Sequence, residues 1–257
     1  MNTGAATVTE MRNYLRSLER SRQSRASRSH ASTFRMRGLE WDLLPDVFAP
    51  NHSPSTGVAL ALLGLPDGGG DFPLAGAVLE MGCGTGLIAV TAALHGSERV
   101  VAADINPAAV RNAELNAARH NVSDRVRAVQ GDLFDGLDAD ERFDVIFWSS
   151  PYVLAPESYT YQHMHERAYV DPGYATHQRF LAQAPQWLTP GGVVLLHFST
   201  RGDLVTLLRV AQAEGRGLHI VRSLVDTEGE HDVDHMLIEV TVRRSLADAT
   251  SVSTSVG

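Results

Sequence analysis

The sequence has no lysine and a single cysteine, so all 22 basic residues of this 257-residue chain are arginines. One cysteine excludes a disulfide within the chain and a zinc site built from several thiolates. No apolar run approaches the roughly 18–20 residues that a membrane-spanning helix needs. The N-terminal segment contains no apolar core of the kind found in secretory signals. These absences predict a cytoplasmic protein with no membrane partner and no bound metal.

Positive charge is unevenly distributed along the chain. The net charge is −8, yet residues 1–37 hold eight arginines against two acids, a net of +6, which leaves −14 for the remainder. Proteins that bind nucleic acid through its phosphates usually carry a strongly basic surface. The composition therefore argues against a nucleic-acid partner, although the basic N-terminal segment could supply a groove. Oligomeric state is left open.

The N-terminal segment predicts a basic helix. Met11, Leu15 and Leu18 follow one another at spacings of four and three, which places them on one face of a helix over residues 9–22. That helix could pack on the main domain, form a lid over an active site, or bind an anionic partner. The expected division is a helical basic extension or lid, a main domain and a disordered tail, over residues 1–50, 51–246 and 247–257.

From residue 76 onward, apolar runs typical of strands alternate with helical segments. Asn106 is a plausible N-cap for one of these helices, with Pro107 at its first position. Two late runs, 218–224 and 236–242, are expected to form an antiparallel pair. The pattern predicts an α/β fold, a doubly wound Rossmann-like sheet of seven strands, mostly parallel with the last strand antiparallel. The other expected strands are 77–81, 99–103, 126–130, 143–148 and 193–198.

A glycine-rich turn follows the first of these strands. Residues 78–86 read Val-Leu-Glu-Met-Gly-Cys-Gly-Thr-Gly, so the glycines have the spacing G-x-G-x-G. Glycine permits positive φ angles and lets a ligand approach the backbone closely. Glu80, two residues before the first glycine, would repel a pyrophosphate but attract an ammonium group. The turn therefore indicates a ligand with a cationic amino-acid part and a nucleoside.

Two further acids stand at the ends of later strands. Asp104 can accept both hydroxyls of a ribose through its two oxygens. Asp132 can accept a hydrogen bond from an adenine amino group, with Leu133 packed on the ring. Either acid alone could be a helix cap or a turn residue, but three acids in this order favour a nucleoside site.

These motifs together resemble the class I S-adenosylmethionine-dependent methyltransferases over about residues 76–242. The resemblance implies that S-adenosylmethionine is the cofactor and S-adenosylhomocysteine the product. It assigns the glycines and Glu80 to the methionine part, Asp104 to the ribose, and Asp132 with Leu133 to the adenine. The full set of cofactor residues implied is Thr56, Glu80, Gly82, Cys83, Gly84, Gly86, Asp104, Ile105, Asp132, Leu133 and Ser149.

A narrower resemblance lies in Ser149-Ser150-Pro151-Tyr152, at the end of the predicted strand 143–148. Methyltransferases that act on planar or amide nitrogens carry Asn-Pro-Pro-Tyr or a similar motif here, whose first side chain and next carbonyl accept the target N–H groups while the aromatic ring stacks. The motif implies that these four residues are catalytic. A further resemblance to the release-factor glutamine N5-methyltransferases lies in two segments, residues 104–110 and 47–50. It extends to three single positions, Thr56, Asn112 and Asn116.

The loop after this motif is rich in tyrosine. Residues 152–174 hold five of the six tyrosines of the chain. A polar, aromatic loop beside a reaction centre suits a substrate with a planar or cationic part. The substrate-binding residues expected are Tyr152, Tyr159, Tyr161, His163, His165 and Glu166.

The sequence predicts a methyltransferase that acts on a nitrogen of a small-molecule substrate, for example in specialised metabolism. Three features favour that acceptor: the acidic charge balance, the tyrosine-rich loop, and an N-terminal segment of roughly 35 residues, which leaves no room for the helical domain that reads release factors. The serines in place of Asn-Pro argue against a glutamine acceptor. Three alternatives are a protein-glutamine N5-methyltransferase, O- or C-methylation with His163, His165 or Glu166 as base, and a non-catalytic cofactor-binding subunit.

Overall fold

The computed structural model describes residues 8–27, 30–65, 74–228 and 231–242. The predicted disordered tail, residues 247–257, lies outside these ranges. Within them, no helix is both long enough and apolar enough to cross a membrane.

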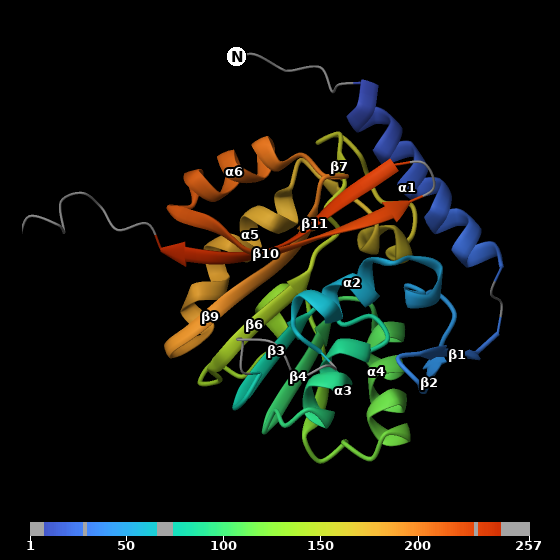
Figure 1. The fold of residues 1–257 in the computed structure, drawn as a ribbon, viewed down its shortest axis with the longest axis vertical. Coiled ribbons are helices and arrows are strands. Elements are labelled where there is room, and N and C mark those ends of the chain that lie inside the picture. Colours follow the sequence, from blue (N-terminus) through green and yellow to red (C-terminus); the bar gives the residue numbers. More distant parts are fainter. Residues whose placement is uncertain (1–7, 28–29, 66–73, 229–230, 243–257) are drawn as a thin grey trace, which may run out of the picture.

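Within the described ranges, the main sheet has seven strands in the order β10-β11-β9-β6-β3-β4-β5 (Figure 1). Neighbouring strands run parallel, except that β11 is antiparallel to both β9 and β10. The predicted doubly wound sheet with an antiparallel last strand is therefore confirmed. Its strands are β3 (Ala77–Met81), β4 (Arg99–Asp104), β5 (Val126–Gln130), β6 (Phe143–Ser149), β9 (Leu188–Ser199), β10 (Arg216–Glu228) and β11 (His231–Val242).

Helices cover both faces of this sheet because the central strands are apolar on both sides. In β6, Val145 and Phe147 point into the core cluster that contains α2, α3 and α4, whereas Ile146 and Trp148 point into the cluster that contains α5 and α6. The predicted N-cap of α4 is confirmed, since Asn106 Oδ1 accepts the Ala108 N–H at 2.9 Å. The helices are α2 (Ser55–Leu62), α3 (Leu87–Leu94), α4 (Pro107–Arg119), α5 (Ala175–Gln183) and α6 (Leu204–Ala213), with short 3-10 turns at Pro50–His52, Leu133–Gly136, Met164–Ala168 and Ala184–Trp187.

A hairpin that the sequence did not predict joins the N-terminal segment to the domain. It consists of β1 (Ser32–Met36) and β2 (Leu39–Leu43), paired antiparallel. Two fully buried asparagines of α4 hold β2: Asn112 bonds the backbone of Asp42 and Leu44, and Asn116 bonds the backbone of Asp42 and Thr85. These side chains satisfy the backbone groups of an edge strand that has no further strand beside it.

The N-terminal helix, α1 (Val8–Ala26), runs along one side of the molecule (Figure 1). Of its apolar stripe, Leu18 packs against the core, whereas Met11 and Leu15 remain 40% and 55% exposed. The buried face instead carries Ser17, Ser21 and Ser24, at helical spacing. Hydrogen bonding explains this orientation, since Ser21 Oγ meets His165 Nδ1 at 2.9 Å.

Candidate active site

A cavity of about 500 Å³ opens at the carboxyl ends of β3, β4, β5 and β6. This edge includes the β3–β6 junction, where the strand order reverses and where open α/β sheets bind their ligands. Ten of the eleven cofactor residues expected from the sequence line the cavity, although their roles stay predictions. The ten are Thr56, Glu80, Gly82, Cys83, Gly84, Asp104, Ile105, Asp132, Leu133 and Ser149.

Two glycines of the turn after β3 have different tasks. Gly84 and Gly86 both adopt positive φ, +54° and +72°. A Cβ at Gly84 would meet no protein atom within 4 Å, so it would project into open space at the cavity wall. A Cβ at Gly86 would lie 2.7 Å from the Cβ and 2.8 Å from the Cα of Ala113. Gly86, the one expected cofactor residue outside the cavity lining, therefore permits close packing of α3 on α4.

The acids beside this turn are held by backbone donors. Glu80 is 4% exposed and accepts the Ala89 N–H at 2.7 Å. Asp104 accepts the N–H groups of Gly84 and Asn106 at 2.9 and 2.8 Å, one on each oxygen. Burial raises the pKa of both carboxyl groups, and the charge of Asp104 raises the pKa of Glu80 further. Because buried carboxylates are stabilised by a nearby positive charge, these two acids favour the binding of a cationic ligand group in the cavity.

These features fit S-adenosylmethionine. The Gly84 cradle leaves space that a side chain would fill, and the acids suit an ammonium group and a ribose diol. A carboxylate has about four lone-pair positions, so Asp104 keeps acceptor capacity beyond its two backbone bonds. At the adenine end, Leu133 has φ of +55°, and Asp132 Oδ2 accepts a hydrogen bond from Arg179 Nη1 at 2.9 Å.

The turn after β6 carries the predicted catalytic residues, and all four line the cavity. Ser149 Oγ lies 2.9 Å from His197 Nδ1. The Ser150 carbonyl, expected to accept a substrate N–H, accepts the Tyr152 N–H at 2.9 Å, and its second lone pair is the one that a substrate would use. Tyr152 is 8% exposed.

The tyrosine-rich loop over residues 152–174 forms a roof, with a short parallel pair, β7 (Leu154–Ala155) and β8 (Asp171–Pro172). Of the residues expected to bind substrate in this roof, Tyr161 and His165 line the cavity, whereas Tyr159, His163 and Glu166 do not. The placement expected for these three needs correction. Glu166 accepts hydrogen bonds from the Tyr159 hydroxyl and the Gln162 N–H, both at 2.8 Å, so it orders the roof from outside the cavity.

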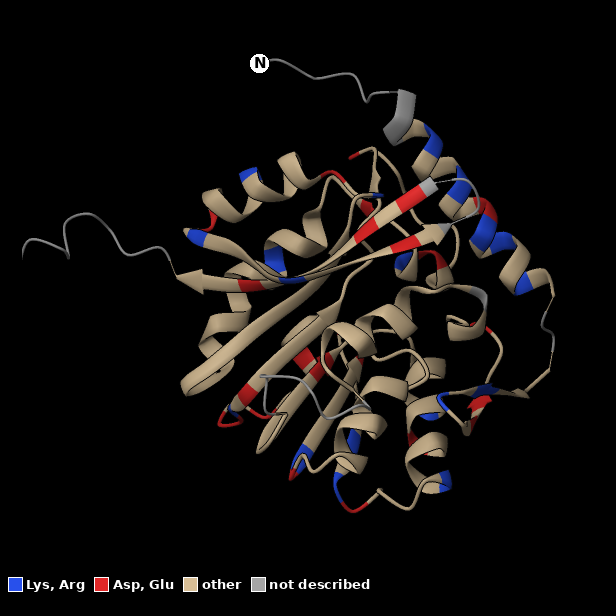
Figure 2. Ribbon diagram, in the orientation of Figure 1, with Lys and Arg blue, Asp and Glu red and all other residues tan. Residues whose placement is uncertain are grey.

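Helix α1 completes the wall with residues that the sequence did not place there. Its arginines are visible as the blue segments in Figure 2. Arg20 of α1 lines the cavity together with Arg167 of the roof and Arg201 after β9. Arg201 donates a hydrogen bond to Ser17 Oγ at 3.1 Å, which ties α1 to the sheet. The acids at the strand ends and these arginines thus give the cavity two regions of opposite charge.

Three further residues at this site were not among the predicted site residues, although Phe48 belongs to the segment 47–50 that resembles the glutamine methyltransferases. Trp148 and Phe48 line the cavity, and the Phe48 ring meets the roof residue Tyr169 at a centroid distance of 5.3 Å. His197 lies behind Ser149, 48 residues later in the chain. The only sequence signal for it is a histidine within an apolar strand. Across the described part of the chain, no three His, Cys, Asp or Glu side chains are grouped so as to hold a metal ion.

Comparison with known proteins gives a consistent result. Residues 78–173 match the family described as "Methyltransferase domain". The chain is 32% identical over 189 residues to a release factor glutamine methyltransferase of Geobacter sulfurreducens, covering 69% of this chain and 62% of that protein. It is 31% identical over 198 residues to the release factor glutamine methyltransferase of Bordetella pertussis, covering 74% of this chain and 71% of that protein. The chain thus spans 62% and 71% of the length of these two relatives, and a smaller share of others, such as 46% of the release factor glutamine methyltransferase of Chlorobaculum tepidum.

The fold is shared with a solved methyltransferase from Pyrococcus furiosus. The two structures agree with a TM-score of 0.54 at 20% sequence identity, covering 90% of this chain and 98% of the other. At that identity the likeness concerns the fold.

Proposed function

We propose, on the premise that this chain belongs to the class I S-adenosylmethionine-dependent methyltransferases, that it transfers a methyl group to the side-chain amide nitrogen of a glutamine in a protein. S-adenosylmethionine is the cofactor of this family. The proposal concerns the acceptor and the residues that hold it.

The prediction of a small-molecule acceptor is wrong. Both curated relatives described above are named for a protein substrate, a release factor. The argument for a small molecule depended on the acidic charge balance, the short N-terminal segment and the tyrosine-rich loop. None of these features outweighs similarity to glutamine methyltransferases over 69–74% of the chain.

The observation that carries the proposal is the position of the Ser149–Tyr152 turn in the cavity wall. This turn, the glycine turn and Asp104 all line the same cavity. Ser149 Oγ can accept an N–H of a primary amide, and the Tyr152 ring offers an apolar surface to a planar group. A planar amide with two N–H groups matches both features.

The residues act chiefly by binding and orientation. When bound, S-adenosylmethionine supplies a methyl group on a cationic sulfur, and the sulfur is the leaving group that keeps the bonding electron pair. An amide nitrogen is a weak nucleophile, so Ser149 and the Ser150 carbonyl must fix its N–H groups with the nitrogen in line with the methyl carbon. The roof and α1 exclude water from the same space. The nitrogen gains the methyl group and loses one proton, which passes to solvent water.

Intact-protein mass spectrometry tests this function. The enzyme and S-adenosylmethionine are incubated with bacterial release factors purified without their modification, and we expect a gain of one methyl group that fragmentation assigns to a glutamine side chain. A release factor with that glutamine changed to glutamate is the acceptor control, and Asp104→Ala is the enzyme control. Transfer to the glutamate protein, or no transfer to any release factor while S-adenosylhomocysteine still binds, would contradict the proposal.

A further inference from the structure

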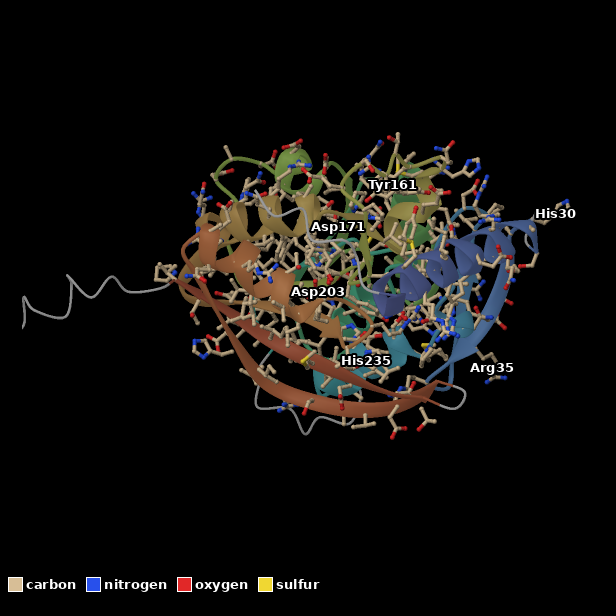
Figure 3. The ribbon with its side chains drawn as sticks, turned by 90° about the horizontal axis from the view of Figure 1, so that it is seen from above. His30, Arg35, Tyr161, Asp171, Asp203 and His235 are labelled. Atoms are coloured by element: carbon tan, nitrogen blue, oxygen red, sulfur yellow. The ribbon has the colours of Figure 1, made fainter. Side chains whose placement is uncertain are left out.

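A chain of three side chains, a partly buried serine and two buried histidines, leads away from the reacting edge of the cavity. Ser149 Oγ lies 2.9 Å from His197 Nδ1, and His197 Nε2 lies 2.9 Å from His235 Nδ1. Both histidines are fully buried, and neither belongs to the cavity lining. His235 is labelled on β11 in Figure 3. The two hydrogen bonds therefore connect the cavity wall with the interior of the sheet.

The sheet register explains why these side chains meet. Ser149 at the end of β6 is the register partner of His197 in β9, and His197 is the partner of Leu237 in β11. His235 precedes Leu237 by two residues, so it points to the same face of the sheet as its neighbours. Three adjacent strands thus contribute one residue each.

The hydroxyl group of Ser149 presents a problem that an asparagine would not. An asparagine side chain has a carbonyl oxygen that only accepts, whereas a serine hydroxyl both donates and accepts, and its hydrogen can rotate. If the Ser149 hydrogen pointed at the amide nitrogen, it would compete for the lone pair that attacks the methyl carbon. Ser149 can serve as an acceptor only if another group takes its hydrogen.

His197 is suited to take that hydrogen. Burial and the neighbouring His235 lower the pKa of His197 to about 3, so the ring is neutral near pH 7, with one N–H and one lone pair. If Nε2 carries the hydrogen and donates it to His235 Nδ1, the lone pair of Nδ1 faces Ser149. The Ser149 hydroxyl then donates to His197, and its oxygen lone pairs are left for the substrate.

We infer that His197 is a positioning residue, which accepts the Ser149 hydroxyl hydrogen and thereby directs the Ser149 lone pairs toward the N–H of the methyl acceptor, with His235 fixing the His197 tautomer. This inference depends on the proposed function for the identity of the acceptor. It explains how a serine can stand where the related enzymes carry asparagine.

A matched pair of variants separates positioning from packing. In His197→Asn the amide can occupy the place of Nδ1 and keep a partner for Ser149, whereas in His197→Gln it reaches the place of Nε2 and keeps a partner for His235. Each variant loses one buried hydrogen bond. We expect kcat to fall about tenfold in His197→Gln and by less than about threefold in His197→Asn. A tenfold loss corresponds to about 1.4 kcal/mol, which is within the range of one hydrogen bond. The KM for the release factor should change by less than about twofold in both.

A double-mutant cycle with Ser149→Ala supplies the second readout. If His197 acts through Ser149, adding His197→Gln to Ser149→Ala should lower kcat by less than about twofold, because the hydroxyl that it orients is gone. Equal losses in the two His197 variants, or a full tenfold loss on the Ser149→Ala background, would show that His197 acts only by packing and would overturn the inference.

The tautomer can be measured without any methyl acceptor. Nitrogen-15 NMR of the wild-type enzyme with S-adenosylhomocysteine should show His197 protonated at Nε2 only. Protonation at Nδ1 overturns the inference whatever the acceptor is. A wild-type enzyme that shows the Nε2 tautomer yet fails to methylate release factors refutes the proposed function instead, so the two failures are distinguishable.

Discussion

Alanine substitutions at Gly84 and Gly86 should separate ligand binding from folding within one turn. Both positions have positive φ, which costs about 1–2 kcal/mol for a residue with a Cβ. At Gly84 that is the whole loss of stability, since the Cβ meets no protein atom within 4 Å. We expect Gly84→Ala to lower Tm by about 2–8 °C.

Gly86→Ala carries a second penalty. Its Cβ would lie 2.8 Å from the Cα of Ala113, a backbone atom that cannot rotate away. Overpacking of this kind costs about 1–3 kcal/mol, for a total of about 2–5 kcal/mol and a fall in Tm of about 4–20 °C.

Binding should follow the opposite order. The Gly84 methyl group projects where the cofactor is expected, so Gly84→Ala should weaken S-adenosylhomocysteine binding by at least about tenfold, or about 1.4 kcal/mol. Gly86→Ala should change the affinity of the folded protein by less than about threefold. Calorimetric titration and thermal unfolding measure the two effects. Wild-type affinity in Gly84→Ala would refute the assignment of this turn to the cofactor.

Three further predictions follow from other contacts. Burial raises the pKa of Glu80 and Asp104, and a ligand cation favours their ionised forms, so binding should release protons and the affinity should rise as the pH increases above the usual carboxyl pKa. Titrations in buffers of different ionisation enthalpy measure the release, and a pH-independent affinity would contradict it. Asn116→Ala removes three hydrogen bonds to Asp42 and Thr85, so it should lower the free energy of unfolding, measured with urea, by about 2–4 kcal/mol. A loss below about 0.5 kcal/mol would show that Asn116 does not hold the hairpin. Removal of residues 1–30 takes α1 out of the cavity wall and should accelerate S-adenosylhomocysteine release in stopped-flow measurements, and an unchanged rate would exclude a lid.

The central sheet was predictable because its signals are local. Runs such as 143–148 are apolar throughout, as strands covered on both faces must be, and Asn106 caps its helix through a neighbour two residues away. The acids at strand ends could be placed at one edge because parallel strands share the direction of their carboxyl ends. The domain boundaries and the roles of the site residues stay predictions.

The features that escaped sequence reasoning depend on distant partners. The β1–β2 hairpin is held by asparagines about 70 residues later in the chain. His197 contacts Ser149 because their strands, β9 and β6, are paired in the sheet. The packed face of α1 could not be identified from its sequence, because it depends on a hydrogen bond from Ser21 to a histidine 144 residues later. Glu166 was expected in the cavity because its neighbours in sequence are there, but its hydrogen bonds turn it outward.

The contacts of α1 also bear on the order of folding. Asn13 donates a hydrogen bond to the Arg201 carbonyl, 188 residues away, and Ser21 bonds His165, 144 residues away. During synthesis the helix leaves the ribosome before the elements on which it docks, and its docking surface exists only after β9 has been made. The helix therefore remains undocked for much of synthesis. Its polar composition suits this, because a strongly apolar helix would be prone to aggregation during that time. We expect pulsed hydrogen exchange during refolding to protect β3, β4 and β6 before the amides of α1, because contacts of such sequence separation form late.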